Sequence, residues 1–295
     1  MTGRLRLKGM QMAFPFLFRR GKRASDRPAA PPPVRRGDRA LSRALELDEL
    51  SIAFQPQFDV ASGATIGVEA LARWPGVASP VELFARAASA NLSERLSRTM
   101  QRKALQAAGR WTGPLADLKL SINLLAEDLA RPGFEHWLLD EMAAAGLAPE
   151  RVTAEITEGS LVADPVAAAA RLARLRAAGV RIAIDDFGTG YASLAYLTTL
   201  PLDLIKIDRG LIIDMVGGTR DRIVVRALIA LARELDLQVV VEGVEDPAQL
   251  ALLQLWGCDY YQGFLGAQAL DEVELARFVS ADRSGAQVPP MRARA

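Results

Sequence analysis

The 295 residues of the chain are half hydrophobic, include one cysteine and one histidine, and carry a formal net charge of +1. This length and apolar content suit one large α/β domain or two small ones, while one Cys and one His exclude both an internal disulfide framework and the usual His/Cys zinc site. Residues 1–40 hold eleven Lys or Arg against two Asp or Glu, a net of +9, so the remainder holds 25 against 33, a net of −8, which argues against duplex nucleic acid as its partner.

Residues 1–40 are expected to form a basic, proline-rich, flexible leader. Pro31, Pro32 and Pro33 stand among Arg, Gly and Asp residues that cannot form a packed core. A weak membrane-surface contact is the alternative to a solvated tail, because the aromatic residues of 14–18 precede the basic residues of 19–23. No apolar run reaches the roughly 18–20 residues that a membrane-spanning helix needs, and we expect a cytoplasmic protein.

From residue 41 the sequence alternates between strand and helix patterns. Apolar and β-branched runs predict eight strands, at Ile52–Phe58, Thr65–Leu71, Leu118–Asn123, Arg151–Thr157, Val180–Asp185, Asp203–Asp208, Gln238–Glu242 and Cys258–Gln262. Helical spacing predicts helices over 41–50, 93–111, 126–145, 164–178, 219–236 and 246–256. Strands that alternate with helices form a mainly parallel sheet, and eight of them over about 245 residues fit a TIM-type (β/α)8 barrel.

Only residues 60–64 separate the first two predicted strands, which is too short for a crossover helix. We therefore expect an antiparallel first strand, so that the α/β fold is a modified (β/α)8 barrel. The barrel should occupy residues 41–280. The polar segment 281–295, which contains Pro289 and Pro290, should be a disordered tail.

Polar side chains end most of the predicted strands. From the second strand to the eighth they are Glu69, Asn123, Glu155 with Glu158, Asp185 with Asp186, Lys206 with Asp208, Glu242, and Gln262. In a parallel barrel these strand ends meet at one mouth, where active sites lie. If these residues had only a structural role, many negative charges would lie close together at this mouth with no cation to neutralise them.

Asp185 and Asp186 precede a turn that contains Gly188 and Gly190. Taken alone, the pair is explained equally well as turn residues or as metal ligands. The other polar strand ends favour ligands, and an all-oxygen donor set selects hard cations such as Mg²⁺ or Mn²⁺. Two adjacent carboxylates can reach two ions, as in phosphoester hydrolysis. Arg73 could pair with a phosphate through its planar guanidinium, although a surface position explains it equally well.

These motifs resemble, in order and spacing, the EAL domain family of cyclic di-GMP-specific phosphodiesterases over about residues 41–275. They are Glu69-Ala-Leu71, Asn123, Glu155-Ile-Thr-Glu158, Asp185-Asp-Phe-Gly-Thr-Gly-Tyr191, Lys206-Ile-Asp208, Glu242-Gly-Val-Glu245 and Gln262-Gly-Phe264. The resemblance implies a barrel that uses two Mg²⁺ or Mn²⁺ ions to open cyclic di-GMP into linear pGpG.

The resemblance also implies a role for each position. The metal ligands would be Glu69, Asn123, Glu155, Asp185 and Asp186, with Asp185 shared by both ions. The catalytic group would comprise Glu242, Lys206 and Glu158. Lys206 would contact the catalytic water, Glu242 would act as a general base or a water-mediated ligand, and Glu158 would brace the glycine turn that couples the site to a homodimer. The substrate-binding residues would be Arg73, Gln262 and Asp208.

The chain departs from the family pattern at the rim and keeps the implied ligands. The loop after Trp74 is short, the family's acidic positions near Ala87 are replaced, and the segment after Gln262 lacks the usual aromatic, Arg and Pro. The altered rim favours one alternative to an active phosphodiesterase, a catalytically weak domain that binds cyclic di-GMP as a receptor or acts as a scaffold. A second alternative, which the motif match disfavours, is a barrel metallohydrolase with a different phosphoester substrate.

Overall fold

The computed structural model describes residues 38–157, 159, 164–188 and 194–283. These belong to one compact unit, which comprises residues 36–295. Three predictions lie outside the described residues: the leader up to residue 37, the role of Glu158, and the tail from residue 284 onward.

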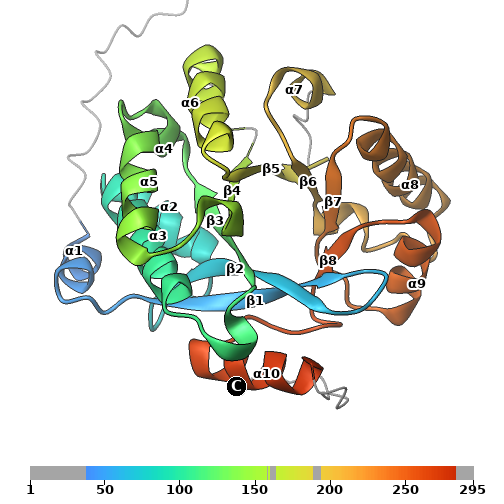
Figure 1. Ribbon diagram of the computed structural model, residues 1–295, viewed down its shortest axis with the longest axis horizontal. Helices are drawn as coiled ribbons and strands as arrows, with labels where there is room; N and C mark the ends of the chain where they lie inside the picture. Colours follow the sequence, from blue (N-terminus) through green and yellow to red (C-terminus); the bar gives the residue numbers. More distant parts are fainter. Residues whose placement is uncertain (1–37, 158, 160–163, 189–193, 284–295) are drawn as a thin grey trace, which may run out of the picture. The chain divides into compact units, whose positions relative to one another are not determined.

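Eight strands close into a barrel in sequence order (Figure 1). They are β1 (Ser51–Asp59), β2 (Thr65–Arg73), β3 (Lys119–Leu124), β4 (Val152–Thr157), β5 (Arg181–Phe187), β6 (Leu204–Ile207), β7 (Gln238–Val241) and β8 (Tyr260–Gln262). All eight predicted strands are present, so the modified (β/α)8 barrel is confirmed. Most of their ends differ from the prediction by one or two residues.

The antiparallel first strand is also confirmed. β1 pairs antiparallel with both β2 and β8, whereas the neighbouring pairs from β2 to β8 are parallel. The short β1–β2 turn is held by Asp59, whose carboxylate accepts hydrogen bonds from the Ser62 amide at 2.7 Å and hydroxyl at 2.6 Å. Gly63 supplies the left-handed conformation that the turn requires, with φ of 74°.

Helices surround the strands (Figure 1). The α-helices are α1 (Arg39–Glu46), α2 (Pro80–Ser89), α3 (Ser93–Gly109), α4 (Ala126–Ala130), α5 (Phe134–Ala145), α6 (Pro165–Ala177), α7 (Leu194–Thr199), α8 (Thr219–Glu234), α9 (Pro247–Trp256) and α10 (Glu272–Arg283). Short 3-10 turns are η1 (Gly113–Leu115), η2 (Pro149–Arg151) and η4 (Arg209–Leu211).

One predicted helix is wrong as a continuous element. Residues 126–145 form α4 and α5, separated at 131–133. Pro132 cannot donate a helical hydrogen bond and Gly133 has φ of 75°, so the helix cannot continue through them. The prediction also omitted α2, α7 and α10, and α10 extends to Arg283, beyond the expected start of the tail.

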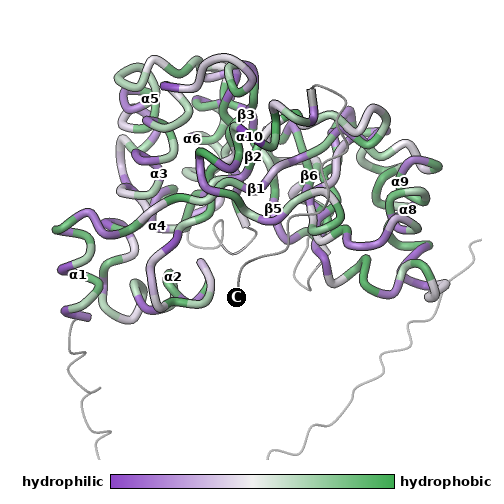
Figure 2. The backbone as a smooth tube through the Cα atoms, turned by 90° about the horizontal axis from the view of Figure 1, so that it is seen from below, coloured by the Kyte–Doolittle hydropathy of each residue, from purple (hydrophilic) through white to green (hydrophobic). Residues whose placement is uncertain are grey.

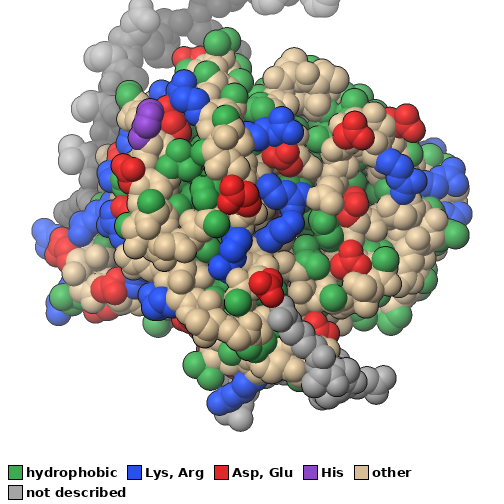
Figure 3. Space-filling view, viewed as in Figure 1, with side chains coloured by type: hydrophobic (Ala, Val, Ile, Leu, Met, Phe, Trp, Pro, Cys, Tyr) green, Lys and Arg blue, Asp and Glu red, His purple; other side chains and the backbone are tan. Residues whose placement is uncertain are grey.

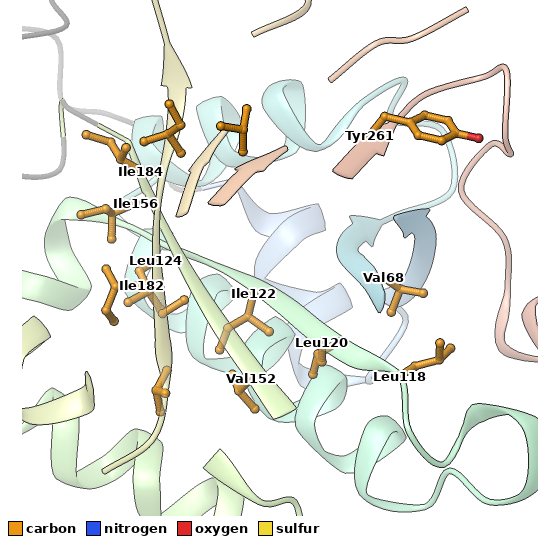
Figure 4. Close-up of a cluster of buried hydrophobic side chains, with 14 of the residues drawn as sticks. Val68, Leu118, Leu120, Ile122, Leu124, Val152, Ile156, Ile182, Ile184 and Tyr261 are labelled. Carbon is orange, nitrogen blue, oxygen red and sulfur yellow. The ribbon is translucent and has the colours of Figure 1, made fainter. Parts of the chain in front are cut away.

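The main hydrophobic core lies between the outer faces of the strands and the helices. Figure 4 shows Leu124, Ile156 and Ile182, from three adjacent strands, grouped in this layer. In Figure 2 the tube alternates between hydrophilic and hydrophobic along single helices such as α3 and α8, as one-sided burial requires. A small separate apolar cluster comprises Ala183, Leu204 and Val240, each two residues before a polar residue of the mouth and therefore on the same face of its strand.

The outer surface is mixed in charge. On the face shown in Figure 3, acidic and basic side chains are interspersed. Within the described ranges, no helix combines the length and the apolar character that crossing a membrane would need.

Candidate active site

Lys206 lies at the centre of the barrel mouth. Its side chain is 1% exposed, and its Nζ atom lies 2.7 Å from Glu155 Oε2 and 2.8 Å from Glu242 Oε1. The same nitrogen lies 3.2 Å from Asp185 Oδ1 and 3.5 Å from Glu69 Oε2. The carboxylates around this ammonium group therefore come from β2, β4 and β5 and from the residue that follows β7.

Amide side chains complete the inner wall around Glu69. Asn123 donates from Nδ2 to Glu69 Oε1 at 2.9 Å, and Gln262 donates from Nε2 to Glu69 Oε2 at 2.8 Å. Two residues of β1 extend this network: Gln262 also donates to Gln55 Oε1 at 3.2 Å, and Gln57 donates to Gln262 Oε1 at 3.0 Å. Sequence reasoning missed both glutamines because it examined only the carboxyl ends of strands, and β1 runs in the opposite direction.

The charges in this cluster are strongly coupled. Burial alone would lower the pKa of Lys206, but Asp185, Glu155, Glu242 and Glu69 raise it well above its usual value. Burial would likewise raise the pKa of Glu69, yet the charge of Lys206 and the amide hydrogen bonds lower it. Burial raises the pKa of Glu242 to about 8, because Lys206 only partly offsets the loss of hydration and the neighbouring carboxylates. The single positive charge of Lys206 is thus too small to neutralise all four carboxylates around it.

Asp186 adjoins this centre from the end of β5. It adopts a left-handed backbone with φ of 56°, and its amide donates to Asp185 Oδ1 at 2.9 Å. Burial raises the pKa of the Asp186 carboxyl, and the charges of Asp185 and Asp208 add to the effect. Oxygen atoms of Asp185, Asp186 and Glu242 lie within 4.8 Å of one another, an arrangement that could hold a metal ion.

The three predicted substrate-binding residues differ in position. Gln262 lies within the buried network described above. Asp208 caps η4, with Oδ1 accepting a hydrogen bond from the Gly210 amide at 2.7 Å. Arg73 ends β2 and donates from Nη1 to the Ala72 carbonyl at 3.0 Å. Burial lowers the pKa of Arg73, while the nearby Glu69 opposes that shift.

A cavity of about 280 Å³ lies against one side of this cluster. Its lining includes Glu69, Asp185, Glu242 and Gln262, together with Phe264, which is 51% exposed. The ion pair between Arg209 and Glu245, at 3.5 Å, also belongs to this wall. The cluster is therefore open to a solute and is not sealed inside the barrel.

Comparison with known proteins identifies the architecture. The family model described as "EAL domain" matches residues 38–269. The chain belongs to the EAL domain family. This result confirms the resemblance that the motifs at the strand ends had predicted.

Curated relatives of this EAL domain include two Pseudomonas aeruginosa proteins. Cyclic di-GMP phosphodiesterase NbdA is 37% identical over 262 residues, which cover 85% of this chain and 33% of that protein. The bifunctional diguanylate cyclase/cyclic di-GMP phosphodiesterase MucR is 36% identical over 245 residues, which cover 81% of this chain and 36% of that protein. The chain thus spans about a third of the length of these relatives.

Solved structures agree with the fold of this EAL domain. A structure described as the PaMucR phosphodiesterase in complex with c-di-GMP has a TM-score of 0.74 and 36% identity, covering 80% of this chain and 97% of that one. A manganese/cy-diGMP complex of BlrP1 from Klebsiella pneumoniae has a TM-score of 0.67 and 35% identity, covering 74% of this chain and 55% of that one.

The donor set of the EAL domain suits a hard divalent cation. The candidate ligands offer carboxylate and amide oxygens, which are the donors that Mg²⁺ and Mn²⁺ prefer. The excess negative charge around Lys206 also favours a cation. Burial, together with repulsion from neighbouring carboxylates, raises the pKa of Asp186 and Glu242, and an added cation would offset both effects. The residues present therefore fit the metal site that the resemblance implied.

Proposed function

We propose that this domain hydrolyses cyclic di-GMP to linear pGpG in a metal-dependent reaction, and so lowers the level of a cytoplasmic second messenger. The observation that carries the proposal is the gathering of four carboxylates around Lys206 at the mouth of an EAL barrel. The substrates named for NbdA and for the MucR structure support the choice of cyclic di-GMP.

The metal ligands of the proposal follow from the donors at the mouth. Two Mg²⁺ or Mn²⁺ ions would be held by Glu69, Asn123, Glu155, Asp185 and Asp186. Bound there, they would lower the pKa of water and stabilise negative charge on the phosphodiester. Asn123 suits this role because its Nδ2 is engaged with Glu69, which leaves the amide oxygen for a cation.

Other side chains would act on substrate and water. Lys206, held protonated by its carboxylate neighbours, would orient the attacking water or stabilise an anionic oxygen. Glu242, whose raised pKa lies near neutrality, would accept a proton from that water. Arg73, Gln262 and Asp208 would bind the substrate, and Asp208 also caps η4 through the Gly210 amide. Glu158 would brace the turn after β5.

We also propose that the domain acts as a homodimer. Ile213 and Val216, which follow η4, are 57% and 44% exposed, and Ile223 and Val224 of α8 are 52% and 42% exposed. Exposed apolar side chains grouped on neighbouring elements favour a protein interface. The weak membrane-surface contact of the basic leader remains a prediction from the sequence.

The function is tested by incubating the purified chain with cyclic di-GMP and Mg²⁺ or Mn²⁺ and separating the products by chromatography. We expect pGpG, and we expect Glu69→Ala to abolish its formation, because that substitution removes a carboxylate that contacts Asn123, Gln262 and Lys206. Glu234→Ala, at an exposed position of α8, is the control and should remain active. Turnover retained in Glu69→Ala would refute the ligand assignment. Binding without pGpG in the wild type would favour a cyclic di-GMP receptor.

A further inference from the structure

Two cations begin the strands on either side of β4. Lys119 is the first residue of β3, and Arg181 is the first residue of β5. Because side chains alternate between the two faces of a strand, Lys119 shares a face with Asn123, whose side chain contacts Glu69 at the mouth. Arg181 shares a face with Asp185 in the same way. Both cations therefore face the barrel interior, at the end opposite to the active site.

An apolar layer separates these cations from the active site. Ala183 lies midway between Arg181 and Asp185 on the inward face of β5. It belongs to the apolar cluster that also contains Leu204 of β6 and Val240 of β7. Both cations are half-buried, so solvent reaches them from their own end of the barrel. In Figure 3, Lys and Arg side chains adjoin one another over the ring of strands.

The guanidinium of Arg181 is held in place by neutral groups. It donates from Nη2 to Gln238 Oε1, and Gln238 donates from Nε2 to the Tyr260 hydroxyl at 2.8 Å. These three residues begin β5, β7 and β8. A guanidinium has five N–H donors in a planar fork. The contact with Gln238 thus orients the fork and leaves donors for a further acceptor.

Lys119 lacks a counter-charge. Burial lowers the pKa of its ammonium group, and the charge of Arg181 lowers that pKa further. Within the described ranges, no carboxylate forms an ion pair with Lys119 or Arg181. Folding therefore brings together two like charges that repel each other, which is unfavourable unless an anion joins them.

A cavity of about 470 Å³ adjoins Arg181 on the outside of this end. Its lining comes from the end of α6, the start of β5 and the segment before β6, and it includes Arg176 and Asp203. The charge of Asp203 is already compensated, because its carboxylate accepts from Arg176 Nε at 2.9 Å and from the Ile182 amide at 2.9 Å. A ligand bound at Arg181 therefore has room to extend into this cavity.

We propose that Lys119 and Arg181 form a phosphate-binding site at the end of the barrel where the parallel strands begin. The ligand is inorganic phosphate or the phosphate group of a nucleotide. A doubly charged phosphate matches two cations, the planar fork of arginine pairs with two of its oxygen atoms, and lysine supplies a compact point charge. The site is separate from the active site, and it goes beyond the proposed function.

Calorimetry of the purified chain, with a chelator present, tests the site. Inorganic phosphate should raise the melting temperature of the wild type with increasing concentration, at an ionic strength held constant with sodium chloride. Lys119→Met should abolish this rise. In chloride alone the variant should melt about 2 °C above the wild type, because it removes a partly buried charge and its repulsion by Arg181. Replacement of a lysine with only a structural role would lower the melting temperature.

Two further variants control for charge and for folding. Arg110→Met also removes one positive charge, but its side chain is 67% exposed and lies 3.9 Å from Glu272. It should respond to phosphate as the wild type does. Lys119→Arg keeps the charge and should retain a rise with phosphate.

Chemical modification tests the site in the wild type alone. Limiting acetic anhydride acetylates accessible lysines, and mass spectrometry of peptides reports each position. Phosphate should slow the acetylation of Lys119 several-fold. Lys103, which is paired with Asp48, should be acetylated at the same rate with and without phosphate.

Titration calorimetry with phosphate and with GMP distinguishes the two sources of the phosphate group. A lower Kd for GMP would assign a nucleotide that extends into the cavity beside Arg181, and an equal or higher Kd would assign inorganic phosphate. The Kd of the assigned ligand should rise at least about tenfold in Lys119→Met, the effect of losing one charge-assisted hydrogen bond.

Three results would overturn the site. They are equal melting temperatures of the wild type in phosphate and in chloride, a rise with phosphate that persists in Lys119→Met, and acetylation of Lys119 that phosphate does not slow. None of these measurements uses cyclic di-GMP or a metal ion, so their failure leaves the proposed function untouched.

Discussion

Lys206 shows how one residue balances the charge of the whole mouth. Its Nζ atom lies within 3.5 Å of oxygen atoms from four carboxylates, so full ionisation would leave three negative charges uncompensated. Its position at a strand end could be predicted from the sequence. Its role as the common partner could not, because that depends on side-chain lengths and on the closure of the barrel.

Removal of the Lys206 charge should destabilise the metal-free protein. We expect Lys206→Met to lower the free energy of unfolding at neutral pH by about 3–5 kcal/mol, because it leaves buried carboxylates without a counter-charge. Mn²⁺ should raise the melting temperature of this variant more than that of the wild type, since the ion would replace the lost positive charge. Calorimetry with and without Mn²⁺ measures both effects.

Lys103→Met is the control for Lys206. Lys103 forms an ion pair with Asp48 at 2.6 Å, and the Asp48 side chain is 73% exposed. Losing this pair, together with the hydrogen bond that Lys103 Nζ donates to the Leu50 carbonyl at 2.7 Å, should cost about 1–2 kcal/mol. Equal destabilisation by the two substitutions, or an equal response to Mn²⁺, would contradict the central role of Lys206.

Asp128 is a residue whose buried charge should make stability depend on pH. It is fully buried in α4, and that burial raises its pKa, although hydrogen bonds from Ser97, the Leu125 amide and Gln101 work in the opposite direction. Since the folded pKa lies above the unfolded value of about 3.9, its contribution is most favourable below that pH and is lost as the pH rises through the folded pKa.

Asp128→Asn removes this titration and keeps the size of the side chain. We expect the free energy of unfolding of the wild type, relative to the variant, to fall as the pH rises above about 4 and to level off above the folded pKa. Urea titrations at a series of pH values measure the difference. A difference that stays constant or rises with pH would show that Asp128 is not held in this environment.

At the scale of elements, the period of the hydrophobic pattern predicted all eight strands and most of the longer helices, although it missed α10. Local chemistry decided other helix boundaries. Pro132 and Gly133 divide α4 from α5, which hydrophobic spacing alone did not reveal. The missed helix α2 does carry a local signal, because the Ser79 hydroxyl caps it by accepting a hydrogen bond from the Glu82 amide and Pro80 occupies its first turn.

The crossing of α3 and α5 requires a glycine. A Cβ atom on Gly109 would lie 2.0 Å from the carbonyl oxygen of Ala145. We therefore expect Gly109→Ala to destabilise the protein by about 1–3 kcal/mol through overpacking, although alanine is the better helix former. Gly217→Ala is the control, because its Cβ would meet nothing within 4 Å. Chemical unfolding that shows equal midpoints for Gly109→Ala and the wild type would mean that the helices do not approach this closely.

At the scale of the whole barrel, the site was predictable because parallel strands deliver their carboxyl ends to one mouth. Glu69, Glu155 and Asp185 meet there as expected. The contributions of Gln55 and Gln57 were not predictable by that rule, since they come from the antiparallel strand.

The proposed dimer would link an exposed surface to the site. A Cβ atom on Gly188, two residues after Asp186, would lie 2.3 Å from the side chain of Leu211 in η4, so the backbone at Gly188 packs directly on η4. Ile213 lies two residues beyond Leu211, and α8, which carries Ile223, is in contact with η4. A partner subunit that covers Ile213 and Ile223 would therefore restrict η4, the element against which Gly188 packs.

Charged substitutions on this surface should separate the subunits and weaken hydrolysis together. We expect Ile213→Glu and Ile223→Glu to convert a dimer into a monomer in light scattering after size-exclusion chromatography, because each buries a charge in an apolar interface. Formation of pGpG should fall with the dimer fraction while the melting temperature stays close to wild type. Leu255→Glu, at a 78% exposed apolar position of α9, should change neither quantity. A wild type that is monomeric at all concentrations and fully active would refute the coupling.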